Sequence, residues 1–161
     1  MSKYKWTIVL VNLALLLVYF NYSIIYKEKT IASGKLVLLK LAPVDPRSLM
    51  QGDYMRLRYE IAEIQDQQLI PKRGYCVVNL DNSGIAHKVR LQKNKTPLTN
   101  IERLVKYSQT DRDISIGAES YFFEEGQSEK YATAVYGALR IDNDGNSVLI
   151  GLYNKDFKLI K

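Results

Sequence analysis

The stretch Trp6-Thr-Ile-Val-Leu-Val-Asn-Leu-Ala-Leu-Leu-Leu-Val-Tyr-Phe-Asn-Tyr-Ser-Ile-Ile-Tyr26 contains no charged residue. As an α-helix, its roughly 21 residues would extend about 31 Å, which matches a hydrocarbon core of about 30 Å. Trp6 near one end and Tyr22 and Tyr26 near the other are typical of the aromatic belts at membrane interfaces. The stretch therefore predicts one transmembrane helix, with residues 6–26 in the lipid bilayer and residues 1–26 as cytoplasmic stub plus anchor.

A cleaved signal peptide is the competing interpretation of this stretch. Its apolar region would be shorter, about 7–15 residues, and small residues would follow at the cleavage site. Here Tyr26-Lys-Glu-Lys-Thr30 follows, and the nearest small pair, Ala32-Ser33, lies well beyond the apolar run, which favours an uncleaved anchor. Lys3 and Lys5 favour a cytoplasmic N-terminus and an exported domain, although Lys27 and Lys29 flank the other end.

After this anchor the composition is that of one ordinary folded domain. The chain has 161 residues, of which 47% are hydrophobic and 25% charged. We set residues 27–34 apart as a linker and treat residues 35–161 as a single extracytoplasmic domain. The net charge of +6 is spread along the chain and interrupted by acidic residues, which argues against a nucleic-acid partner. The single cysteine, Cys76, excludes an internal disulfide and is expected to be buried.

The pattern within the domain indicates strands. In Tyr54-Met-Arg-Leu-Arg-Tyr-Glu-Ile61 apolar and charged residues alternate, which predicts a half-buried strand. Asp81-Asn-Ser-Gly84 and Asp142-Asn-Asp-Gly-Asn146 are strong hairpin turns. A short helix is expected within residues 124–133. Further strands are expected at residues 35–41, 75–80, 85–92, 101–107, 114–116, 135–141 and 147–153. The predicted fold class is mainly β, an antiparallel β-sandwich or partly open barrel.

Few residues carry recognisable chemistry. With one histidine, His87, and one cysteine, a zinc site of the usual kind is excluded, and we predict neither a metal nor a cofactor. His87 shares parity with Val89 and is expected to point inward or to lie at a rim. Pro46-Arg-Ser-Leu-Met-Gln-Gly52-Asp53 is similar to a stretch of membrane-anchored signal peptidases. Their nucleophilic serine would fall at Pro43, which has no hydroxyl, so that mechanism loses its nucleophile.

One short sequence motif, called the box below, indicates a particular family more specifically than the stretches above. Gly52-Asp53-Tyr54-Met-Arg-Leu57-Arg-Tyr59 matches the pattern Gly-Asp-Tyr-x-x-Leu-x-Tyr at every specified position and resembles the GDYXXLXY proteins of bacteria. A second block, residues 117–126, is also similar, although a proline commonly stands where Glu124 does. The resemblance covers most of residues 35–153. It implies one N-terminal span in the bacterial inner membrane, a periplasmic domain, and genes beside or fused to those of multi-pass membrane proteins; it implies no activity.

Two interpretations of the box stay open. In the structural one it fixes a bend and a core strand, with Leu57 and Tyr59 in the core. In the functional one it borders a groove for a peptide or a partner loop. The candidate groove residues are Asp53, Tyr54, Arg56, Arg58, Glu119, Tyr121 and Glu125.

For the whole protein, the first hypothesis is a non-enzymatic accessory protein that engages a multi-pass membrane partner or an extracytoplasmic ligand. The alternative is a membrane-tethered hydrolase that uses a carboxylate pair such as Asp53 and Glu119. The sequence does not determine the oligomeric state.

Overall fold

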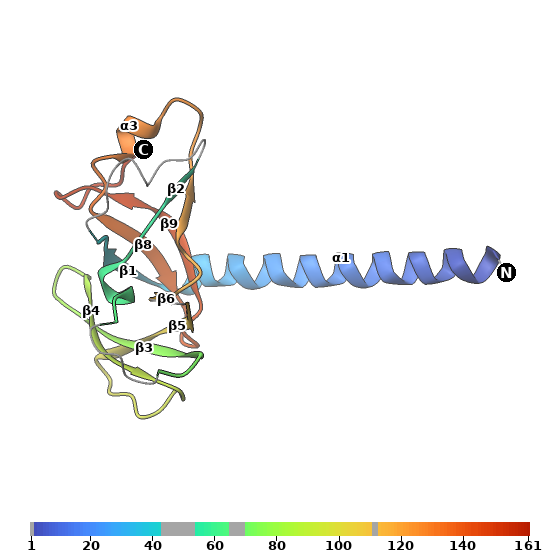
Figure 1. Ribbon diagram of the computed structural model, residues 1–161, viewed down its shortest axis with the longest axis horizontal. Helices are drawn as coiled ribbons and strands as arrows, with labels where there is room; N and C mark the ends of the chain where they lie inside the picture. The colour runs from blue at the N-terminus through green and yellow to red at the C-terminus, as the bar shows by residue number, and fades with distance from the viewer. Residues whose placement is uncertain (1, 43–53, 65–69, 111–112) are drawn as a thin grey trace.

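A single long helix carries the β-rich domain at its end (Figure 1). The computed structural model describes residues 2–42, 54–64, 70–110 and 113–161. Helix α1, Ser2–Ser33, has 32 residues. Between Tyr4 and Ser33 its most apolar window has a mean hydropathy of 2.2 and none of that window is buried. By length and composition α1 can therefore cross a membrane, a property that it shares with signal sequences.

The helix does not end where the apolar stretch ends. Within the predicted linker, residues 27–34, all residues but the last continue α1 to Ser33. Lys27, Glu28 and Lys29 are good helix formers, so the helix needs no apolar side chains to continue. The chain leaves α1 at Gly34, whose N–H donates to the carbonyl of Thr30 at 2.8 Å.

The strand nearest to α1 in sequence enters a three-stranded antiparallel sheet of order β1-β8-β9. Its strands are β1 (Lys35–Lys40), β8 (Tyr136–Ile141) and β9 (Ser147–Tyr153). The turn between β8 and β9 is the predicted one, and Gly145 takes the positive φ of 81° that this turn requires. This hairpin is confirmed.

A second sheet has four antiparallel strands in the order β4-β3-β5-β6. They are β3 (Arg73–Leu80), β4 (Ala86–Gln92), β5 (Glu102–Gln109) and β6 (Ile114–Ser115). Two backbone contacts join this sheet to the first. The N–H of Leu38 donates to the carbonyl of Gly84 at 2.9 Å, and the N–H of Lys106 donates to that of Gly145 at 2.8 Å.

The third sheet is a two-stranded ribbon of β2 (Tyr54–Arg56) and β7 (Ser120–Phe122). The strand predicted over residues 54–61 is thus much shorter, because the chain turns into a 3-10 helix η1, Glu60–Ala62. Its alternation is nevertheless correct: Met55, Leu57, Tyr59 and Ile61 are all buried. The only other α-helix in the described part of the chain is α3, Ser128–Tyr131.

The core lies between these sheets and takes side chains from all of them. Its fully buried members include Val37, Leu39, Tyr59, Cys76, Val77, Val78, Val105, Leu139 and Leu152. Burial raises the pKa of the Cys76 thiol to about 12, so Cys76 packs as a small apolar side chain, as expected. The predicted fold class is confirmed, and the described strands do not form a closed barrel.

The orientation of β4 differs from the prediction. Its buried face begins at Ala86, so His87 points outward with its side chain 64% exposed and lies 3.2 Å from an Asp81 oxygen. Two positions on the face of β4 that starts with Ala86 instead hold basic residues, Lys88 and Arg90, and the charged group of each has a hydrogen-bond partner. Arg90 pairs with Glu102, and the ammonium of Lys88 donates to the carbonyl of Glu63. These partners offset the partial desolvation of two half-buried basic side chains.

The Arg90–Glu102 pair makes the domain sensitive to acid. Arg90 and the N–H of Thr99 donate to the Glu102 carboxylate at 3.0 and 2.9 Å, and they lower the pKa of Glu102 from its ordinary 4.5 to about 2. Because the folded-state pKa is the lower one, this stabilisation is complete above about pH 4.5 and is lost as pH falls toward 2. We expect the urea midpoint of the full chain in detergent to fall across that range.

The variant Glu102→Gln should flatten this low-pH slope, whereas Glu125→Gln, at an exposed carboxylate, should leave the loss of stability in place. Asp81 and Asp142 also have lowered pKa values, so part of the slope should remain in Glu102→Gln. An unchanged slope in that variant would contradict the assignment.

Candidate functional site

The two sequence blocks quoted above lie side by side in the fold. Strands β2 and β7 pair antiparallel, with Tyr54 opposite Phe122, Met55 opposite Tyr121 and Arg56 opposite Ser120. One residue beyond β2, the N–H of Leu57 donates to the carbonyl of Glu119 at 2.8 Å. The first box is therefore hydrogen-bonded to the second block along its length from Tyr54 to Leu57.

One face of this ribbon is buried. Met55 is 3% exposed, and its cross-strand partner Tyr121 packs edge-on against Tyr131 with ring centroids 5.1 Å apart. Phe123 packs against the same Tyr131 ring, with ring centroids 5.4 Å apart. Burial and the hydrogen bond with Tyr131 raise the pKa of Tyr121 to about 12. Tyr121 therefore belongs to an aromatic cluster with Phe123 and Tyr131, on the side of the ribbon away from Tyr54.

The other face of the ribbon is open to solvent. Tyr54 and Phe122 contact each other with ring centroids 5.7 Å apart, and Phe122 is 74% exposed, more than any other large apolar side chain of the described domain. Arg56, on the same face, is exposed as well. We call Tyr54, Arg56 and Phe122 the ribbon surface. Phe122 was not among the candidates from the sequence, because only the cross-strand pairing places it beside Tyr54.

The remaining candidates are distributed differently. The Glu119 carboxylate accepts hydrogen bonds from the N–H groups of Ile116 and Gly117, so it closes its own loop. The guanidinium of Arg58 pairs with Asp113 at 3.0 Å. Glu125 is exposed. Gly52 and Asp53 lie outside the described residues, and so do Pro43, Pro46 and Ser48. In the described part of the chain no cluster of three His, Cys, Asp or Glu side chains is placed to hold a metal ion.

The last residue of the box ties the ribbon to the core. Tyr59 is completely buried, and its hydroxyl donates to the carbonyl of Ala118 at 2.6 Å. Its ring lies against β8 at Gly137, where an added Cβ would be 2.8 Å from the ring atom Cε1. Burial, with a smaller contribution from Glu119, raises the pKa of the Tyr59 phenol, which keeps it a neutral donor. Tyr59 thus joins both sequence blocks to the β1-β8-β9 sheet.

A comparison with known protein families shows which family this chain belongs to. The model of the family described as GDYXXLXY protein matches residues 16–152, most of the chain. The chain belongs to the GDYXXLXY family. Neither the curated proteins nor the solved structures contain a match. In this GDYXXLXY protein, Leu57 and Tyr59 of the signature are buried, and Tyr54 faces outward on the ribbon surface.

A second feature of this GDYXXLXY protein is the contact between α1 and the β8–β9 turn. The Tyr26 hydroxyl donates to Asp142 Oδ2 at 3.0 Å and accepts a hydrogen bond from the Asn146 side chain at 2.5 Å. Four residues further along the helix, Thr30 is 3% exposed. Desolvation raises the pKa of Asp142, but the hydrogen bonds from Asn146, Tyr26 and the Asp144 N–H together hold it below its ordinary value. The helix is therefore fixed against the domain.

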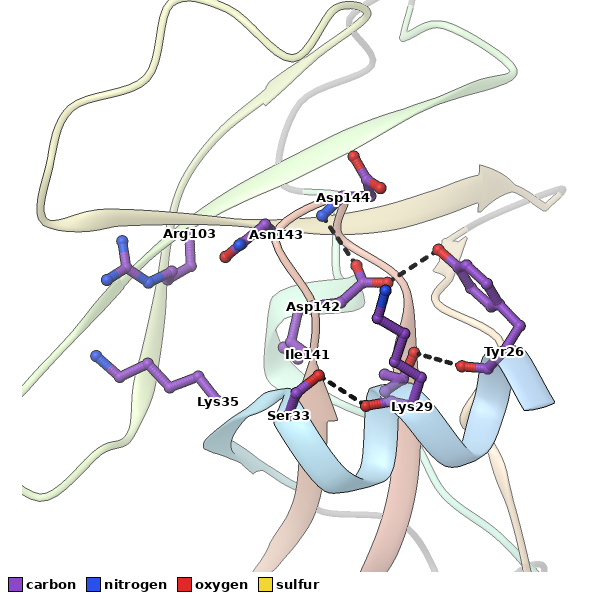
Figure 2. A pocket seen from close by; sticks show the side chains of 10 residues that line it. Tyr26, Lys29, Ser33, Lys35, Arg103, Ile141, Asp142, Asn143 and Asp144 are labelled. Atoms are coloured by element: carbon purple, nitrogen blue, oxygen red, sulfur yellow. Dashed lines mark hydrogen bonds between the residues drawn. The ribbon is translucent and has the colours of Figure 1, made fainter. Parts of the chain in front are cut away.

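A cleft of about 360 Å³ opens at this contact. Figure 2 shows the Lys29 side chain extending from the helix toward the β8–β9 turn, with Lys35 and Arg103 on the other side of that turn. We call this cleft between α1 and the β8–β9 turn the junction cleft. It is lined by Tyr26, Lys29, Thr30, Ser33, Lys35, Arg103, Ile141, Asp142, Asn143 and Asp144. Residues 27–34 and 142–146 were predicted to be a linker and a turn, and nothing local in the sequence indicates that these two segments meet, so the cleft was not predicted.

Proposed function

We propose that this protein is a membrane-anchored accessory protein whose β-domain binds a multi-pass partner in the same membrane. In this proposal α1 crosses the bacterial inner membrane with its N-terminus in the cytoplasm, and the domain lies in the periplasm. The observation that carries the proposal is the ribbon surface. A half-buried tyrosine and an exposed phenylalanine beside an exposed arginine have the composition of the residues that dominate binding energy at protein interfaces.

The helix contact supports a partner in the same membrane. Because Tyr26 is bonded to the β8–β9 turn and Thr30 is buried, the domain does not swing freely on a flexible tether. A domain with a fixed orientation presents the ribbon surface at one height above the bilayer. That arrangement suits a partner whose own position is set by the same bilayer.

The alternative of a hydrolase gains no support from the described residues. Acid–base catalysis by a carboxylate pair needs two carboxylates that face one cleft, whereas Glu119 turns Oε1 to two backbone N–H groups of its own loop and does not line the junction cleft. The thiol of Cys76 is buried and its pKa is raised, which disfavours the thiolate that a nucleophile requires.

Photo-crosslinking in cells tests the partner. A benzophenone amino acid at position 122 should give an adduct with one multi-pass membrane protein, identified by mass spectrometry. The matched control is position 89, because Val89 is also an exposed apolar residue, 48% exposed, and lies on β4, which belongs to a different sheet from β2 and is drawn in the lower half of the domain in Figure 1. The same adducts at both positions, or none at position 122, would contradict the proposal.

Alanine substitutions give the expected size of the effect. Tyr54→Ala and Phe122→Ala should each reduce copurification of the crosslinked partner from mild detergent about tenfold, since truncated interface anchors cost roughly 1–2 kcal/mol. Val89→Ala should leave it unchanged. Undiminished recovery of the partner with the double variant Tyr54→Ala/Phe122→Ala would place the interface elsewhere.

A further inference from the structure

The junction cleft lies where a membrane would present its headgroups. This inference uses one part of the proposed function, that α1 crosses a bilayer. Lys29 is three residues beyond Tyr26, which is about 4–5 Å along a helix. The headgroup region adds roughly 5–8 Å on each side of the hydrocarbon core. The β8–β9 turn reaches the same depth, because Asp142 is bonded to Tyr26.

The cations of the junction cleft lack ion-pair partners among the described residues, whereas its carboxylates are occupied. Nη1 of Arg103 donates to the backbone carbonyls of Asn100 and Glu102 at 3.1 and 2.8 Å, but these carbonyls carry no net charge. Among the described residues, no carboxylate lies within 4.0 Å of the charged groups of Lys29, Lys35 or Arg103. Asp144 pairs with Lys95 from outside the cleft at 2.5 Å. Asp142 accepts hydrogen bonds from Tyr26, from Asn146 and from backbone N–H groups of its own turn. With Lys95 included, four cations face two carboxylates.

These cations are not needed for the end of the helix. Basic side chains near a helix C-terminus often serve its unpaired carbonyls and its dipole. Here other groups do so. The guanidinium of Arg140 donates to the carbonyl of Gly34 at 2.9 Å, the N–H of Gly34 donates to Thr30, and the Ser33 hydroxyl donates to the carbonyl of Lys29. Glu28, beside Lys29 in the sequence, is not among the residues that line the cleft.

We propose that the junction cleft binds the phosphate of an anionic phospholipid headgroup, through Lys29, Lys35 and Arg103, and thereby holds the domain against the bilayer. The cleft volume of about 360 Å³ is within the usual range for small-ligand sites. Juxtamembrane cations are attracted to anionic leaflets, and the Arg103 guanidinium has the fork geometry that suits phosphate oxygens.

The test uses the full chain in nanodiscs of phosphatidylcholine, with or without phosphatidylglycerol, and measures hydrogen exchange of the backbone at residues 27–34 and 141–146. Phosphatidylglycerol should slow exchange about tenfold, and the variant Lys29→Gln/Lys35→Gln/Arg103→Gln should abolish this slowing. The matched control is Lys155→Gln/Lys158→Gln/Lys161→Gln, which removes three exposed lysines outside the cleft. In this control, phosphatidylglycerol should still slow the exchange. Urea unfolding checks that the variants fold, and Lys29→Gln/Lys35→Gln alone serves if the triple variant does not.

Three outcomes would overturn the proposal: equal exchange in both lipids, an equal loss in the two triple variants, or the same slowing by inorganic phosphate in pure phosphatidylcholine discs. The last would indicate a site for free anions. Because the discs contain no partner protein, these outcomes are independent of the crosslinking at position 122, and the partner proposal can fail while the lipid proposal stands.

Discussion

Replacing Tyr59 with alanine is expected to destabilise the domain by about 3–5 kcal/mol, the usual cost of removing a fully buried aromatic ring. Tyr59 has no exposed surface and contacts three parts of the fold, so the surrounding residues cannot easily fill the space. Small domains have a total stability of roughly 5–15 kcal/mol, and the variant therefore loses a large share of it. Urea unfolding of the full chain in detergent measures the change.

Two further variants separate the contributions of ring and hydroxyl. Tyr59→Phe keeps the ring but leaves the carbonyl of Ala118 without the donor that it has at 2.6 Å, which should cost about 1–3 kcal/mol. Gly137→Ala places a Cβ 2.8 Å from the Tyr59 ring and should cost about 1–3 kcal/mol through overpacking.

Combining these variants gives a sharper test of the contact. In the Tyr59→Ala background the Gly137→Ala methyl group enters the space that the ring has left, so its cost should disappear and the two effects should not be additive. Strict additivity would show that Gly137 and Tyr59 do not make the contact described.

The local parts of this fold could be predicted from sequence because their causes are local. Alternation over residues 54–61 placed Met55 and Tyr59 on the buried face even though only residues 54–56 form a strand. Alternation depends on an extended backbone, not on a partner strand, and Tyr59 remains extended with φ −104° and ψ 140°. The turns ending at Gly84 and Gly145 were likewise identified from residues that tolerate positive φ.

The candidate site could be predicted only in part, because its contacts join distant segments. The pairing of β2 with β7 has no local signal, so Tyr121 was grouped with Tyr54 although it faces the other side, and Phe122 was missed. His87 was misplaced because the parity of β4 is set by the burial of Ala86 and by distant partners for Lys88 and Arg90. Whether the predicted residues bind a partner stays a prediction.

The second large effect is expected at Gly34, where α1 enters the domain. A Cβ added there would overlap the carbonyl oxygen of Thr30 and would lie 3.1 Å from backbone atoms of Ile141. All of these are backbone atoms, so no side-chain rotation relieves the overlap. Gly34→Ala should therefore push the end of the helix away from β8, at a cost of roughly 1–3 kcal/mol or more.

The damage from Gly34→Ala should concentrate at the contact between helix and domain, because the atoms that the new Cβ would meet belong to Thr30 of the helix and to Ile141 at the end of β8. Hydrogen exchange at residues 30–34 and 141–146 should accelerate, since the bonds of Tyr26 to Asp142 and Asn146 require the helix in place. Exchange in β3 and β5 should stay slow. The neighbouring variant Ser33→Ala removes only the exposed hydroxyl bond to Lys29 and should leave the turn protected. If Gly34→Ala also left it protected, α1 and the β8–β9 turn would not be held together as described, and both the fixed orientation of the domain and the junction cleft would lose their basis.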